Sequence, residues 1–169
     1  VNGAIQNFGT IFVSGTQSTA TTDTGNPVPG SALIVSGNVT HGIYNAGPLT
    51  DSDGSTAASS ISTSGASPAL LITTGYLGTS TLLPVTIGGF AESGGSTYSL
   101  FNRGSISSTT QNIDVSSTAV QIAGSSGDRV TLSSGIFNSG TISAQSTGDT
   151  NGSGTTTASA LVIGGYTTV

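Results

Sequence analysis

One seven-residue phrase occurs four times in this chain, and it constrains the fold more than any other feature. The phrase consists of an aliphatic residue, any residue, Asn, any residue, Gly, any residue, and then Ile or Leu. Its copies span residues 5–11, 43–49, 100–106 and 136–142. A second phrase, Ala followed by aliphatic positions, comes after each copy, at residues 32–35, 69–72, 119–122 and 160–163. Two phrases that return in a fixed order indicate a repeat architecture.

The spacing of the first phrase predicts the repeat boundaries. Its asparagines are separated by 38, 57 and 36 residues. An inserted segment at about 73–96 explains the long middle interval, and without it the three intervals agree within the period of solenoid proteins. We interpret residues 1–169 as a single repeat segment that belongs to a longer chain or filament. Its predicted repeats are about 5–42, 43–99, 100–135 and 136–169.

The repeats read as short strands. Their aliphatic runs are bounded by Gly, Asn and Ser, which is typical of strands, and no window carries the 3.6-residue period of a helix. A third phrase lies at 38–40, 85–87 and 129–132. We therefore predict an all-β parallel β-helix of about four coils, with three short strands in each. The Ser/Thr/Gly-rich stretches at 14–30, 50–67, 107–118 and 143–159 are predicted to be loops at one corner, forming a decorated edge.

The Asn-x-Gly step suggests two structural roles. A corner requires positive φ, which Gly adopts without steric cost. When coils stack at about 4.8 Å, equivalent residues lie above one another, so the asparagines should form a hydrogen-bonded ladder. The predicted ladder consists of Asn7, Asn45, Asn102 and Asn138 with Gly9, Gly47, Gly104 and Gly140. Tyr44, Phe101 and Phe137 should stack in a neighbouring column.

Charge excludes several partners. The chain has no lysine, two arginines and seven acidic residues, giving a net charge of −5. Nucleic-acid binding and attraction to anionic membranes need clustered basic residues. No apolar run approaches the roughly 20 residues of a membrane-spanning helix. We expect neither nucleic-acid binding nor membrane insertion by this segment.

Catalytic chemistry is also not expected. His41 is the only histidine, and no Gly-x-Ser-x-Gly phrase accompanies it. Without cysteine a zinc site would need a histidine cluster. Asp51 and Asp53 are expected to lie in a solvated turn and not in a calcium-binding loop. The acidic residues share no register on the predicted strands, whereas glycoside cleavage needs paired carboxylates. We predict no enzymatic activity, no cofactor and no metal.

The phrases at 135–144 and 158–165 resemble repeats in the passenger regions of bacterial type V autotransporters and large surface adhesins. This resemblance implies a right-handed parallel β-helix that is secreted and displayed on, or released from, the bacterial surface. It also implies roles in surface structure, adhesion or self-association.

Three functions follow as expectations. The first is a structural, non-catalytic segment of an extracellular bacterial surface protein or filament. Its terminal coils carry no polar cap, so uncovered strand edges should pair head to tail with other copies or with flanking repeats. The second is an adhesin that binds glycans or a host surface through the decorated edge, with Tyr76, Phe90 and Tyr98 as stacking residues. The third is a polysaccharide-cleaving enzyme or phage tailspike, which the scattered acids disfavour.

Overall fold

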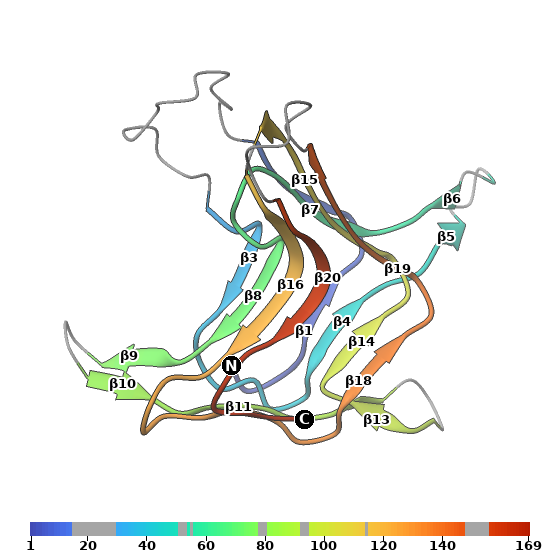
Figure 1. Ribbon diagram of the computed structural model, residues 1–169. Coiled ribbons are helices and arrows are strands. Elements are labelled where there is room, and N and C mark those ends of the chain that lie inside the picture. Colours follow the sequence, from blue (N-terminus) through green and yellow to red (C-terminus); the bar gives the residue numbers. More distant parts are fainter. Residues whose placement is uncertain are drawn as a thin grey trace.

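Figure 1 shows the computed structural model of the chain. It describes residues 1–14, 30–50, 54, 56–77, 81–91, 95–113, 115–147 and 156–169. Every regular element in these ranges is a β-strand, which confirms the all-β prediction. The described residues include no helix of the length and apolarity that crossing a membrane requires.

Four parallel sheets, named A to D here, contain most of the strands. Sheet A orders β1 (Ile5–Asn7), β4 (Ile43–Asn45), β14 (Leu100–Asn102) and β18 (Ile136–Asn138). Sheet B orders β2 (Thr10–Ser14), β7 (Ser60–Ser64), β15 (Ser105–Ile113) and β19 (Thr141–Thr147). Sheet C orders β3 (Leu33–Val35), β8 (Leu70–Thr73), β16 (Ser117–Ala123) and β20 (Ala158–Ile163). Sheet D orders β11 (Val85–Ile87), β17 (Val130–Leu132) and β21 (Thr167–Thr168), with Val39 bridged to Ile87.

The chain visits these sheets in a fixed order. It runs through A, B, C and D, returns to A one strand further along, and repeats this passage. We call each passage a circuit. Each circuit adds one strand at the same edge of sheets A, B and C, and the four sheets surround a common interior (Figure 1). The repeated phrases pair in register, with Asn7 opposite Asn45, Asn45 opposite Asn102, and Asn102 opposite Asn138.

The interior is filled by columns of aliphatic side chains. One residue from each circuit contributes to a column, and the residues of the middle circuits are fully enclosed. The columns are Ile43 and Leu100 from sheet A, Ile61 and Ile106 from sheet B, Leu70, Ile72, Val120 and Ile122 from sheet C, and Val85, Ile87, Val130 and Leu132 from sheet D. Burial of branched aliphatic side chains on pleated strands is the main stabilising contribution of such a core.

Sheet B corrects the prediction of three strands per repeat. Parts of the stretches expected to be loops at 50–67, 107–118 and 143–159 are strands of this sheet or of sheet C. Strand β7 reads Ser-Ile-Ser-Thr-Ser, and its residues alternate between buried and half-buried positions, so one Ile and one Thr point inward. The Oγ1 of Thr63 donates to the carbonyl of Ser67 (3.1 Å), which makes its burial tolerable. The expected loop at 14–30 lies almost wholly outside the described residues.

Among the described residues, three antiparallel hairpins lie between β4 and β14, two within the second circuit and one directly after it. They pair β5 (Leu49–Thr50) with β6 (Thr56–Ala57), β9 (Gly75–Leu77) with β10 (Thr81–Leu83), and β12 (Phe90–Ala91) with β13 (Thr97–Tyr98). The predicted single insertion at about 73–96 is therefore two hairpins on either side of β11, which belongs to sheet D. The hairpins project at three different corners (Figure 1). The insertions are therefore not confined to one edge, as the sequence predicted for the loops.

The Leu49 position of the phrase also departs from the prediction. Leu49 lies in the β5–β6 hairpin, and Ile61 takes the inward position between Ile11 and Ile106. A hairpin can be inserted between two positions of the phrase because the strand after it re-enters the ladder in register.

Replacing Ile106 by Ala should cost about 4 kcal/mol of unfolding free energy, because its side chain is fully enclosed and leaves a cavity. Ile142 is the next member of the same column, but it lies in the last circuit and is only half-buried. Ile142→Ala should therefore cost about half as much. Urea unfolding followed by circular dichroism measures both, and equal losses would contradict an open end at the last circuit.

Candidate functional site: the asparagine ladder and the end circuits

The four asparagines of sheet A form a continuous chain of side-chain hydrogen bonds. The Nδ2 of Asn7 donates to Oδ1 of Asn45 (2.9 Å). The Nδ2 of Asn45 donates to Oδ1 of Asn102 (2.7 Å), and the Nδ2 of Asn102 donates to Oδ1 of Asn138 (2.6 Å). All three bonds run in the same direction, from each circuit to the next. The ladder therefore has a donor end at Asn138 and an acceptor end at Asn7.

Each donor amide of this ladder also reaches the main chain of the following circuit. The second acceptors are equivalent carbonyls of sheet B, at Ser60 for Asn7 (3.0 Å), Ser105 for Asn45 (3.2 Å) and Thr141 for Asn102 (3.2 Å). A primary amide has two N–H donors, so both are used at each of these levels. Asn45 and Asn102 are completely buried, and this full use of their donors is what makes the burial favourable.

Two buried serines that the sequence does not single out support this region. The Oγ of Ser59 donates to the carbonyl of Ala46 and lies 3.2 Å from Oδ1 of Asn45. The Oγ of Ser99 donates to the carbonyl of Ile87 (2.8 Å) and accepts from the backbone N–H of Ser134 (3.0 Å). Both precede a strand in a Ser-rich context, which offers no distinguishing signal in the sequence.

The glycines of the phrase do not have the role expected from the sequence. The sequence predicts positive φ for them, but Gly9, Gly47, Gly104 and Gly140 all have ordinary φ values. A Cβ on Gly104 would lie 2.5 Å from the carbonyl oxygen of Ala46, and one on Gly140 would lie 2.6 Å from the carbonyl carbon of Arg103. At Gly104 and Gly140 the glycine is required because the backbone of the preceding circuit lies against it.

The aromatic column of sheet A is covered by a hairpin. Tyr44 contacts Phe101 edge-on at 5.5 Å between ring centroids, and Phe101 contacts Phe137 at 4.8 Å. From the β12–β13 hairpin, Phe90 stacks on Tyr44 at 4.6 Å and Tyr98 packs against Phe101 and Phe137. Two of the three aromatics considered for glycan stacking thus pack within this cluster.

The third aromatic considered for glycan stacking is Tyr76. Its backbone lies in β9, and its side chain is outside the described part of the chain.

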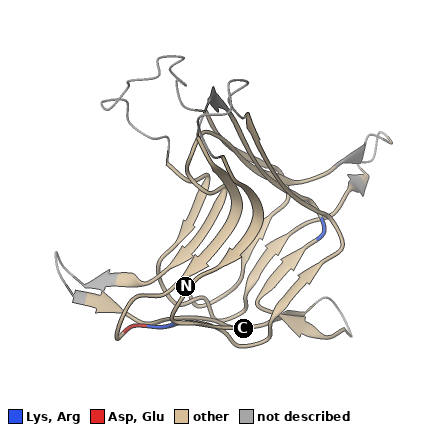
Figure 2. Ribbon diagram, viewed as in Figure 1, with Lys and Arg blue, Asp and Glu red and all other residues tan. Residues whose placement is uncertain are grey.

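Few charged side chains occur among the described residues. They are Arg103, Arg129 and Asp128, and they lie in two separate places (Figure 2). The guanidinium carbon of Arg103 lies 5.3 Å from the ring centroid of Phe101, a cation–π distance. Within the described residues no three His, Cys, Asp or Glu side chains come together. The other six acidic residues, Asp51 and Asp53 among them, lie outside the described ranges.

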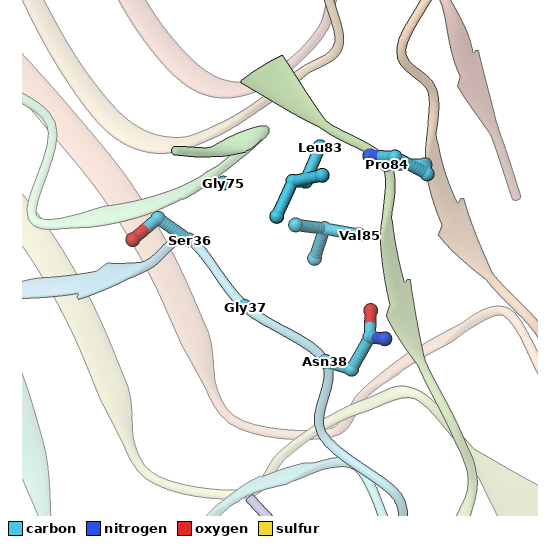
Figure 3. A pocket seen from close by; sticks show the side chains of 7 residues that line it. All are labelled: Ser36, Gly37, Asn38, Gly75, Leu83, Pro84 and Val85. Atoms are coloured by element: carbon cyan, nitrogen blue, oxygen red, sulfur yellow. The ribbon is translucent and has the colours of Figure 1, made fainter. Parts of the chain in front are cut away.

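A pocket of about 280 Å³ lies at the corner between sheets C and D, beside the β9–β10 hairpin (Figure 3). It is lined by Ser36, Gly37, Asn38, Gly75, Leu83, Pro84 and Val85. The Oδ1 of Asn38 accepts from the backbone N–H of Thr86 (2.8 Å), so this amide joins the two walls of the corner. The lining carries no titratable side chain and offers no acid–base chemistry.

The two end circuits leave several aliphatic columns open, although Val35 and Val39 of the first circuit are buried. In the last circuit Leu161 is 39% exposed and Ile163 is 49% exposed, whereas their register partners Val120 and Ile122 are fully buried. In the first circuit Ile5, Ile11 and Leu33 are half-buried, although their partners one circuit further in are enclosed. The strands of these circuits also form the outer edges of sheets A, B and C. Each end therefore presents apolar surface together with a strand edge.

Asn102→Ala should lower the unfolding free energy by about 3 kcal/mol, because it removes a buried amide that bonds to both neighbouring circuits. Asn138→Ala is the matched control: Asn138 is exposed and its loss should cost about 1 kcal/mol. Chemical denaturation measures both values. Equal costs would mean that the ladder contributes no more inside the molecule than at its end.

Gly104→Ala should destabilise the fold by about 3 kcal/mol, because the added methyl group overlaps the main chain at Ala46 and Ser59. Gly9 holds the same position in the phrase, but no atom lies within 4 Å of the point that an added methyl group would occupy there. Gly9→Ala should change stability by less than about 0.5 kcal/mol. Thermal unfolding of both variants provides the comparison, and a large loss for Gly9→Ala would show that backbone conformation, not close approach, requires the glycine.

Comparison of the chain with protein-family models, with curated proteins and with solved structures found no match.

Proposed function

We propose that this chain is a structural, non-catalytic segment of an extracellular bacterial surface protein or self-assembling filament, folded as a right-handed parallel β-helix of about four coils. The observation that carries this proposal is that the columns of the repeat reach both ends of the chain. The same columns of asparagine and aliphatic residues run from the first circuit to the last, and each end leaves aliphatic members of these columns partly or largely exposed. A rod built in this way is completed by more circuits of the same kind.

The β-helix assignment is supported by the order of the strands. Successive circuits place β1, β4, β14 and β18 side by side, all parallel and in register, and the strands of sheets B and C follow the same rule. Parallel strands need long connections between neighbours in a sheet. Here each connection is the rest of a circuit, which passes through the other three sheets.

The structural role is supported by the contacts that the asparagine and aromatic side chains of sheet A make. The asparagines bond to one another between circuits, and the aromatics of sheet A pack on each other and on the β12–β13 hairpin. These contacts join neighbouring circuits and hold a hairpin onto them. The extracellular bacterial location is supported by the resemblance of the phrases at 135–144 and 158–165 to autotransporter passenger repeats.

Electron microscopy of the purified chain tests the proposal. We expect unbranched fibres whose diffraction has an axial spacing of about 4.8 Å, the distance between paired strands. Leu161→Glu should abolish the fibres, because this side chain lies in the open column at the end of the last circuit. Val162→Glu is the control on the same strand, since Val162 pairs with the half-buried Gln121 on the outer face.

The outcomes separate clearly. Uniform short particles of the unmodified chain at high concentration would overturn self-assembly through the ends. Fibres that survive Leu161→Glu but disappear with Val162→Glu would show association through the outer face of sheet C instead.

A further inference from the structure

The outer face of sheet B is covered almost entirely by hydroxyl side chains. Its four strands pair in one continuous register over their first five residues. On every strand the second and fourth of these residues point toward the interior, whereas the first, third and fifth point outward and are exposed or half-buried. Of the twelve outward residues, ten are Ser or Thr, and the other two are Phe12 and Gln145.

The strands of this face carry no charge. They contain no Asp, Glu, Lys or Arg, and Figure 2 shows their described residues in tan. The neighbouring faces are different. The aromatic column of sheet A lies beneath the β12–β13 hairpin, and the outer face of sheet C carries Ile34, Leu71 and Val162. Sheet B is therefore distinguished by a dense array of neutral hydrogen-bonding groups.

The sheet places these hydroxyls on a two-dimensional grid. Neighbouring strands are about 4.8 Å apart, and alternate residues along a strand are about 6.7 Å apart. Ser62, Ser107 and Ser143 thus hold equivalent positions on three adjacent strands. Hydroxyls in the same rotamer keep the strand spacing, which is too long for a direct O–H···O bond of about 2.7 Å. Even the contact from Ser60 Oγ to Thr10 Oγ1 measures 3.3 Å. A hydroxyl has one donor and two acceptor sites, so water bridges are the natural completion of this grid.

A tetrahedral network of water has repeats close to those of the grid. With hydrogen bonds of about 2.75 Å, two oxygens bonded to the same water lie about 4.5 Å apart, and a hexagonal network repeats after about 7.3 Å in the perpendicular direction. The face offers about 4.8 Å and 6.7 Å. Over four strands the mismatch across the strands adds up to about 1 Å, which slightly bent bonds can absorb.

Such a match also requires a flat face. Side-chain ladders and stacking are what keep a sheet from twisting. Here the asparagine ladder and the aliphatic columns hold each strand directly above the preceding one. The same contacts that stabilise the interior therefore keep the hydroxyl grid regular.

We propose that the outer face of sheet B binds ice, by holding a first layer of water whose positions continue into the crystal lattice. Anionic ligands would need basic side chains, which these strands lack. A saccharide ring is held mainly by apolar and aromatic surface with a few polar groups, whereas Phe12 is the single aromatic residue on the strands of this sheet. This activity goes beyond the structural role proposed above and does not depend on assembly.

Ser107 is the position at which this inference is tested most directly. It lies in the middle of the face, between Ser62 and Ser143 on the neighbouring strands, and its side chain points outward. Ser107→Lys would place a long, strongly hydrated cation over the grid. Gln121→Lys is the matched control, because Gln121 is equally half-buried but lies on the outer face of sheet C. Ser107→Thr keeps the hydroxyl in place.

The measurement is thermal hysteresis, the gap between the melting and freezing temperatures of a single ice crystal in a solution of the 169-residue chain. The shape of the crystal and the inhibition of ice recrystallisation are recorded with it. Far-ultraviolet circular dichroism checks that each variant is folded. We expect hysteresis and faceted crystals for the unmodified chain, a several-fold loss for Ser107→Lys, and no loss for Gln121→Lys or Ser107→Thr.

Three results would overturn the inference. The first is a folded, unmodified chain that neither shapes ice crystals nor gives hysteresis. The second is an equal loss for the two Lys variants, because the added charge and not its place on sheet B would then decide the effect. The third is sedimentation of the chain with microcrystalline cellulose or chitin, lost in Ser107→Lys and without any hysteresis, which would assign the face to a neutral polysaccharide instead.

Discussion

The hydrogen bond between asparagine side chains of successive circuits is the interaction on which the rest of the structure depends. A buried amide is costly unless its donors and acceptor are used. Asn45 meets this requirement only when Asn7 lies below it and Asn102 lies above it in the same register. A slip of one residue would turn the asparagines away from one another and expose the aliphatic columns. The ladder and the hydrophobic core therefore select the same register.

The close approach of the circuits follows from this register. With strands held in pairing contact, the main chain beside each asparagine leaves no room for a Cβ at Gly104 or Gly140. The same restriction applies at Gly88, where a Cβ would meet the carbonyl of Thr40, and at Gly124, where it would meet that of Tyr166. These positions lie at the corners between sheets, where the chain bends and neighbouring circuits stay at the distance of paired strands. Glycine thus sets the distance between circuits at the corners, and the asparagines fix their rotation about the axis.

The repeated phrases contain enough information to predict which residues share a column, because a column requires similar residues at equivalent positions. The register of Ile5 with Ile43, and of Leu33 with Leu70, can be read directly from the sequence. Sheet B could not be predicted in this way. Its strands contain mostly Ser and Thr, and a strand with one inward Ile and satisfied hydroxyls looks like a loop. The hairpins could not be predicted for a related reason. Each is inserted between two repeat positions, and the strands on either side of it keep the same register with the neighbouring circuits.

The direction of the ladder makes the two ends chemically different. The first circuit offers Asn7 Oδ1 as acceptor, and the last offers the amide of Asn138 as donor. Two first circuits facing each other would bring acceptors together, and two last circuits would bring donors together, so the ladder continues only head to tail. In quasi-one-dimensional folds, stability is the sum of repeat and interface terms. Each added circuit encloses columns such as that of Leu161, while the number of open ends stays at two. Continuation in one direction is therefore the arrangement that both the polar ladder and the apolar columns favour.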